Sequence, residues 1–194
     1  MEASVAAVPE NATLESILLD MVNLLPDWKA DQKARLDELA GWLLAMVQED
    51  LQMCKQTAKQ RGLSWEGKLD LFGSMREQDG NNWGHTDSVV IKEGATTLMT
   101  KGSDGCKGVV EEYTTSVTLQ NGESALKHAL HKVSKRFESP RSEILICEIN
   151  VDFSANNEIS RIVAKRNTDS PPQKEGSFYY RPLEKFVTHE LYLS

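Results

Sequence analysis

Apolar residues at the start of the chain recur every three or four positions, which is the spacing of one helix face. Thr13 stands directly before the first such run, where its hydroxyl can accept a hydrogen bond from the first turn, and Pro26 ends the run. The pattern therefore predicts a first helix over residues 14–25. Its apolar stripe consists of Leu14, Ile17, Leu18, Met21, Val22 and Leu25.

A second and longer helix is predicted from Asp27 to Arg61, and Gly62 follows it in a position that suits a helix C-terminus. The first helix is too short to cover all of the apolar surface of the second. We therefore expect the remainder to pack on the sheet or on a second copy of the chain, as a homodimer through residues 36–54. The apolar residues of this surface are Leu36, Trp42, Leu43, Met46, Val47, Leu51 and Met53.

From residue 87 onward the period of the apolar pattern shortens to two, which is the spacing of strands. The short connections between these runs predict antiparallel pairing, because parallel strands need long crossovers. Glycine-rich residues at 77–85 and 101–107 are expected to form a loop and a turn. The predicted strands cover residues 88–92, 96–101, 109–119, 143–153, 159–165 and 186–193.

One segment between these strands returns to helical spacing. Leu126, Leu130, Val133 and Phe137 form an apolar stripe, and a serine–proline pair at 139–140 stops the run. The spacing predicts a third helix over residues 123–137.

These elements predict an α+β fold, in which an N-terminal helical pair and one further helix pack on a mainly antiparallel β-sheet. Residues 1–11 are expected to form a flexible leader, residues 12–62 a helical region, and residues 63–194 an α+β sheet domain continuous with it. The order of three strands, one helix and two strands resembles the core of type III secretion chaperones, which are also small and acidic.

The charge of the chain is unevenly distributed. The 194 residues carry a formal net charge of −7, and the whole excess of Asp and Glu lies in residues 1–50. Such an acidic segment disfavours nucleic acid and anionic lipid and favours a basic partner. Because neither a secretion signal nor an apolar run of bilayer length is visible, we expect a cytoplasmic protein without membrane contact.

Metal and redox signatures are weak. Cys54, Cys106 and Cys147 are widely spaced and lack a C-x-x-C pair, which is typical of reduced thiols. His128 and His131 stand three residues apart on the predicted third helix, but neither has a further ligand at a suitable spacing. We therefore expect no metal and no cofactor.

The predicted third helix carries a basic surface. Lys127, His128, His131, Lys135 and Arg136 flank its apolar stripe, so an acidic partner protein or a phosphate group could bind there. The alternative is an ordinary solvated helix face, with Lys135 and Arg136 placed in the last turn to complement the helix dipole.

The sequence contains no known catalytic motif, and one short stretch, residues 83–87, combines side chains that could take part in catalysis. His85 and Asp87, which follow Trp83, could line a pocket in which the histidine acts as an acid or a base. A turn that leads into a strand explains the same residues. The glycine-rich run at 102–108 lacks the phosphate-loop pattern and is better explained as a hairpin turn.

These observations favour a non-enzymatic, cytosolic binding or adaptor protein that acts through a protein–protein interface and forms oligomers. Two alternatives remain open. One is an enzyme with a dispersed active site around His85 and Asp87. The other is a binder of phosphate or nucleic acid that uses the basic helix at 123–137.

Overall fold

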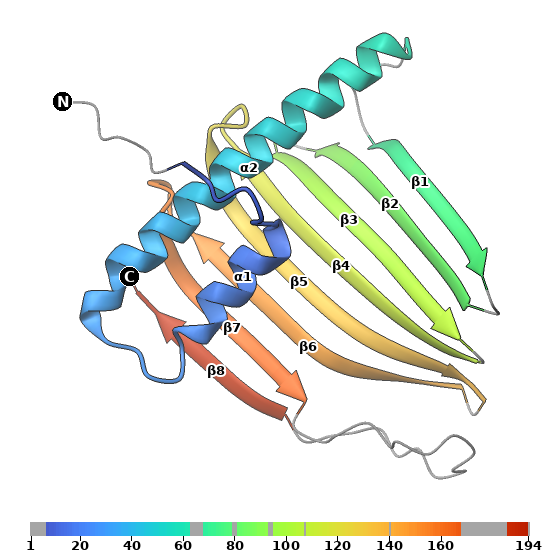
Figure 1. Cartoon of the computed structure of the whole chain (residues 1–194). Coiled ribbons are helices and arrows are strands. Elements are labelled where there is room, and N and C mark those ends of the chain that lie inside the picture. The colour runs from blue at the N-terminus through green and yellow to red at the C-terminus, as the bar shows by residue number, and fades with distance from the viewer. Residues whose placement is uncertain are drawn as a thin grey trace.

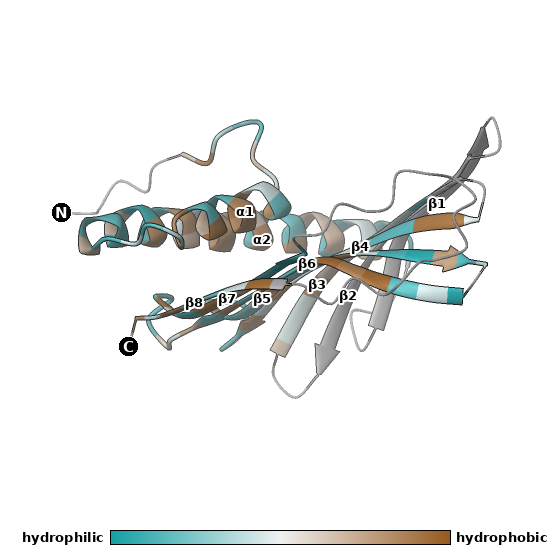
Figure 2. Cartoon of the chain, turned by 90° about the horizontal axis from the view of Figure 1, so that it is seen from below, coloured by the Kyte–Doolittle hydropathy of each residue, from teal (hydrophilic) through white to brown (hydrophobic). Residues whose placement is uncertain are grey.

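The computed structural model describes residues 7–62, 68–78, 81–92, 95–106, 108–139, 141–167 and 186–193 (Figure 1), with only the backbone described for 68–78, 81–92, Cys106 and Phe186. Within these ranges the chain forms two α-helices, one short 3-10 helix and an eight-stranded sheet. Both α-helices lie on one side of the sheet (Figure 2). The α+β class expected from the sequence is therefore confirmed.

The sheet is an antiparallel meander in which each strand pairs with its neighbours in sequence. From β1 to β7 this topology follows from the short connections, because a strand that turns back at once pairs with the strand before it. The pairing of β8 with β7 spans a longer connection, residues 168–185. The strands are β1 (Lys68–Gln78), β2 (Asn81–Lys92), β3 (Ala95–Cys106), β4 (Val109–Gln120), β5 (Ala125–Glu138), β6 (Arg141–Phe153), β7 (Ile159–Asn167) and β8 (Phe186–Tyr192).

The first helix, α1 (Leu14–Asn23), begins at the cap expected from the sequence. The Thr13 hydroxyl accepts a hydrogen bond from the Ser16 N–H at 3.0 Å, and the Ser16 hydroxyl oxygen accepts one from the Thr13 N–H at 2.8 Å. This reciprocal pair satisfies two N–H groups at the helix start that have no partner within the helix.

The second helix, α2 (Lys33–Gln60), follows a 3-10 turn over Ala30–Gln32 and crosses the sheet with α1 at its side (Figure 1). Two contacts at the β4–β5 turn attach α2 to the sheet. Lys55 Nζ lies 2.6 Å from Glu123 Oε2, and Gln48 Nε2 donates to the Glu123 carbonyl at 3.2 Å. Glu123 has a φ of 76°, a conformation that costs free energy for a non-glycine residue, and these two contacts hold it there.

We call the face under the helices the covered face and the opposite one the open face. Strand alternation separates the two sets of side chains. One row of directly opposite residues crosses six strands on the covered face. In the middle four strands of this row the residues are completely buried, at 0% exposure. The row consists of Leu98, Val117, Ala129, Val151, Ile162 and Leu191.

This row packs with α1 and α2 into one apolar cluster. Leu36, Leu39 and Leu43 of α2 and Leu18 and Met21 of α1 are completely or almost completely buried in it. The helical region and the strands β3–β7 therefore share a single core.

The third helix predicted over 123–137 is wrong, because these residues form the turn after β4 and the strand β5. A β-bulge explains the misleading spacing. Lys127 has no partner on β4, since Leu126 pairs with Leu119 and His128 with Thr118. Leu126 and Ala129 thus share one face at a separation of three, which imitates a helix.

Two further expectations need correction. The turn expected at 101–107 is strand as far as Cys106, and most of the expected loop at 77–85 belongs to β1 and β2. A glycine can lie inside a strand of this sheet, as Gly102 of β3 shows: the ring of Tyr113 on β4 occupies the space that a side chain at 102 would need. The resemblance to type III secretion chaperones also fails, because it required a helix where β5 lies.

Candidate ligand site between α1 and the sheet

A cavity of about 500 Å³ lies on the covered face, between the second half of α1 and the strands β6, β7 and β8. Its floor is formed by two rows of residues next to the filled core row. Ile149, Ala164 and His189 belong to one of these rows, and Cys147 and Arg166 to the other. The cavity therefore lies where the helical layer stops short of completely covering the sheet.

The walls of the cavity are mainly apolar. The apolar lining residues are Leu19, Val22, Pro26, Ile146, Ile149, Ala164 and Val187. Polar groups come from Asn23 at the end of α1, from Lys165, Arg166 and Asn167 at the end of β7, and from His189 on β8. Among the lining residues that the structure describes, none is an aspartate or a glutamate. An apolar chamber with a few polar groups at its border is the usual composition of a small-molecule site.

Cys147 contributes a half-buried thiol to this cavity. Burial raises the pKa of the thiol, and the nearby Arg166 only partly offsets that effect. The thiol is therefore protonated at neutral pH, whereas a nucleophilic cysteine needs its thiolate form. Cys147 is better suited to contact a ligand than to attack one.

His131 lies in the same row as Ile149 and Ala164, one strand further into the sheet. Its ring is 1% exposed, and its Nδ1 shares a hydrogen bond of 2.8 Å with the Thr115 hydroxyl. Nε2 lies 3.5 Å from Glu15 Oε1 in the first turn of α1. Burial lowers the pKa of His131, and Glu15 opposes this shift to a smaller extent. The histidine thus joins α1 to the sheet in its neutral form.

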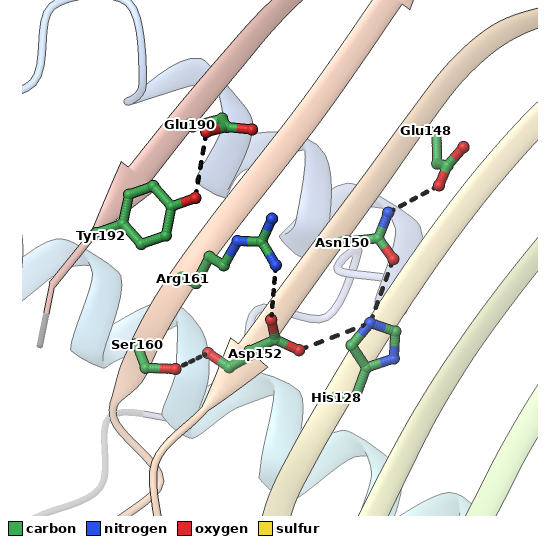
Figure 3. A network of polar contacts seen from close by, with 8 residues as sticks. All are labelled: His128, Glu148, Asn150, Asp152, Ser160, Arg161, Glu190 and Tyr192. Carbon is green, nitrogen blue, oxygen red and sulfur yellow. Dashed lines mark hydrogen bonds and ion pairs between the residues drawn. The ribbon is translucent and has the colours of Figure 1, made fainter.

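The open face carries a network of polar side chains on β5–β8 (Figure 3). His128 Nε2 lies 3.2 Å from Asn150 Oδ1 and 3.9 Å from Asp152 Oδ1. Arg161 Nη1 lies 3.8 Å from Asp152 Oδ2, and its guanidinium lies 5.5 Å from the centre of the Tyr192 ring.

The same network extends to the edges of this region. Asn150 Nδ2 donates to Glu148 Oε1 at 2.9 Å, and the Tyr192 hydroxyl donates to Glu190 Oε2 at 3.2 Å. Acidic and basic side chains alternate from strand to strand, so Asp152 on β6 lies between His128 on β5 and Arg161 on β7. Such cross-strand pairs stabilise a solvated sheet face by a few tenths to about 1 kcal/mol each.

The basic residues predicted to bind a partner do not form one surface. His131 lies on the covered face, whereas His128 and Arg136 lie on the open face. Arg136 is paired with Glu112 at 3.4 Å and Lys135 with Glu111 at 3.9 Å. The prediction of a continuous basic helix surface over Lys127, His128, His131, Lys135 and Arg136 is wrong, because a strand sends alternate side chains to opposite faces.

The apolar surface predicted on α2 packs on the chain itself. Leu36, Trp42, Leu43, Val47 and Leu51 are buried, and Met46 is partly buried against the same cluster. Met53, which is 60% exposed, is the exception in this set. Packing on the sheet, one of the two expected arrangements, accounts for this surface.

The backbones of His85 and Asp87 pair with Gly102 and Thr100 on β3. Their side chains lie outside the described part of the structure, so the catalytic hypothesis stays a prediction. Among the residues that the structure describes, no group of three metal-ligating side chains comes together. No helix in the described ranges combines the length and apolar character that a membrane crossing requires.

Sequence reasoning missed the cavity residues as a site. The alternation from 145 to 153 predicted that Cys147 and Ile149 share a face, but no local signal showed that α1 would end above them. Arg166 and His189 are distant in sequence and become neighbours only through the pairing of β7 with β8.

No protein-family description, no curated protein and no solved structure matches this chain.

Proposed function

We propose that this protein is a non-enzymatic binding protein that holds a small molecule with an apolar body in the cavity between α1 and β6–β8. The cavity itself carries the proposal: its volume of about 500 Å³ lies within the range of about 300–1,000 Å³ typical of ligand pockets. Its apolar walls provide the favourable free energy of removing apolar surface from water.

The lining also indicates the kind of polar group that the ligand carries. Arg166 borders the cavity, and in the described part of the chain no carboxylate lines the cavity beside it. A ligand with a carboxylate or similar anionic group at one end therefore complements the site, since a guanidinium binds carboxylates through two parallel hydrogen bonds. A medium-chain fatty acid has this chemistry.

The experiment measures binding of the fluorescent anionic probe anilinonaphthalene sulfonate to the full chain. Ala164 is 4% exposed and faces the cavity, so Ala164→Phe fills it with an aromatic ring. We expect at least about a tenfold loss of probe affinity, and displacement of the probe from the wild type by decanoate but more weakly by decanol.

Ala155→Phe is the matched control, because Ala155 is exposed in the β6–β7 turn, away from the cavity. Its affinity should equal that of the wild type. If Ala164→Phe is folded, as judged by circular dichroism, and binds the probe with the affinity of the wild type, the proposal is contradicted. If Ala164→Phe does not fold, Ala164→Leu provides a smaller filling of the same space.

Protein–protein binding, expected from the sequence, is a second candidate function. It is favoured by the exposed apolar side chains of the edge strand β8. Val187 is 41% exposed and Tyr192 is 60% exposed, and with Met53 they are the large apolar residues most open to solvent in the described ranges. Val187 lies on the covered face and Tyr192 on the open face, so both sides of this edge strand present apolar side chains to solvent, as is typical of an edge that can take a partner.

A further inference from the structure

The two outer strands of the sheet differ in how well they are protected against pairing with another strand. β1 contains Lys68, Asp70, Arg76 and Glu77, and its pairing with β2 is irregular near Asp70. Charges and bulges at an edge discourage the addition of a further strand. β8 contains one charged residue, Glu190, and its pairing with β7 is regular throughout.

The hydrogen-bonding groups on the outer edge of β8 can be identified. The Leu193 N–H donates to the Ser160 carbonyl on β7 at 2.9 Å. Because N–H groups alternate in direction along a strand, those of Leu191, His189 and Val187 also face β7. Those of Thr188, Glu190 and Tyr192 therefore point away from the sheet. In the described ranges no strand pairs with this outer edge.

We infer that this edge pairs with β8 of a second copy of the chain, in antiparallel orientation, about a two-fold axis at His189. This inference gives the second candidate function a definite partner and is independent of the cavity proposal. The two sheets then continue into one another, and the outward N–H groups gain partners. A two-fold axis is the commonest symmetry of protein dimers.

The sequence of β8 selects this register. An axis at His189 pairs Thr188 with Glu190 of the second copy and Val187 with Leu191 of the second copy. The exposed Val187 side chain thereby gains an apolar neighbour. An axis at Glu190 instead opposes two carboxylates directly, which is unfavourable. An axis at Thr188 pairs fewer residues of the strand.

The first test removes one outward N–H. Thr188→Pro leaves the hydrogen bonds to β7 intact, because the Thr188 N–H points away from that strand, and proline is tolerated at such edge positions. We expect the wild type to be dimeric and Thr188→Pro monomeric in sedimentation at about 50 µM. Thr188→Ala, the matched control, should remain dimeric.

The second test uses charge and keeps the backbone unchanged. Thr188 is exposed, and its neighbour across the proposed interface is Glu190 of the second copy. Thr188→Asp should weaken the dimer and Thr188→Lys should strengthen it, with dissociation constants that differ at least about tenfold. Within one copy the neighbour is Lys165 on β7, so the stability of the isolated chain should follow the opposite order.

A monomeric wild type at 50 µM would overturn the inference and leave the cavity proposal unaffected. A dimer that persists in Thr188→Pro, or equal dissociation constants for the Asp and Lys variants, would also overturn it, because the dimer would then use another surface. Probe binding to a monomeric Thr188→Pro variant separates the two proposals directly.

Discussion

The covered and open faces are built from the same strands but are stabilised in different ways. Ile162 of β7 faces the helices and is 0% exposed, whereas its sequence neighbour Arg161 faces solvent with a 45% exposed side chain. The covered face gains free energy from apolar burial, and the open face carries paired charges in water. Side chains on the covered face therefore contribute most of the free energy that stabilises this sheet.

The covered face is itself divided. Beneath α2 the apolar side chains of the cluster are buried, but at the end of α1 the same face leaves the cavity over Ala164 and Ile149. Protein interiors normally contain few voids larger than a water molecule. A space of this size at the border of a well-packed core is therefore the region where function is expected.

The largest effect should come from truncating the covered face. Ile162→Ala removes a completely buried side chain and leaves a void, so we expect the free energy of unfolding to fall by about 2–5 kcal/mol. Urea denaturation followed by circular dichroism measures this change. A loss below about 1 kcal/mol would show that the helices do not close this part of the core.

His131 is the polar exception on the covered face, and its replacement should have an intermediate effect. His131→Leu leaves the hydroxyl of Thr115, which is 4% exposed, without its partner. We expect a loss of about 1–3 kcal/mol at pH 7, and a partial recovery in the double variant with Thr115→Val. If the losses of unfolding free energy in the two single variants simply add up in the double variant, His131 and Thr115 are not coupled.

The same residue predicts a pH dependence. Because burial lowers the pKa of His131 below its ordinary value of 6.5, the unfolded chain takes up this proton more readily than the folded chain. The wild type should therefore lose stability as the pH falls through 6.5 toward 5, and the slope should be smaller in His131→Leu. Equal slopes in urea titrations at pH 7, 6 and 5 would show that His131 titrates as if exposed.

The smallest effect should come from the open face. Arg161→Ala removes the contacts with Asp152 and the Tyr192 ring, both of them exposed to solvent. We expect a loss below about 1 kcal/mol, which decreases further as salt is added. A loss comparable to that of Ile162→Ala would mean that the two faces contribute equally.

The pattern of apolar residues predicted an element correctly where the spacing of these residues stayed constant over the whole element. The apolar stripes predicted α1 over 14–25 and α2 over 27–61, close to the observed Leu14–Asn23 and Lys33–Gln60, and strict alternation predicted β4, β6 and β7. It failed at β5, where the bulge at Lys127 changes the phase of the alternation and the residues have good intrinsic helix propensity. Pairing with β4 and β6 on both sides overrides that propensity.

The site was less predictable than the fold. A cavity is defined by where packing stops, and packing depends on how α1 lies over β6–β8. Cys147 and Arg166 are next to each other only because of the strand register. His131 was assigned to an exposed basic surface, because a histidine among lysines gives no sign in the sequence of facing a core.

The rate at which Cys147 is alkylated by N-ethylmaleimide tests the central claim most directly. Cys147 lines the cavity, whereas Cys54 is buried in α2 and serves as an internal reference for unfolding. We predict that saturating decanoate slows modification of Cys147 at least about tenfold, as followed by peptide mass spectrometry. The modification rate of Cys54 should differ by no more than about twofold with and without decanoate. Decanoate that leaves the Cys147 rate unchanged at every concentration would contradict a ligand site between α1 and the sheet.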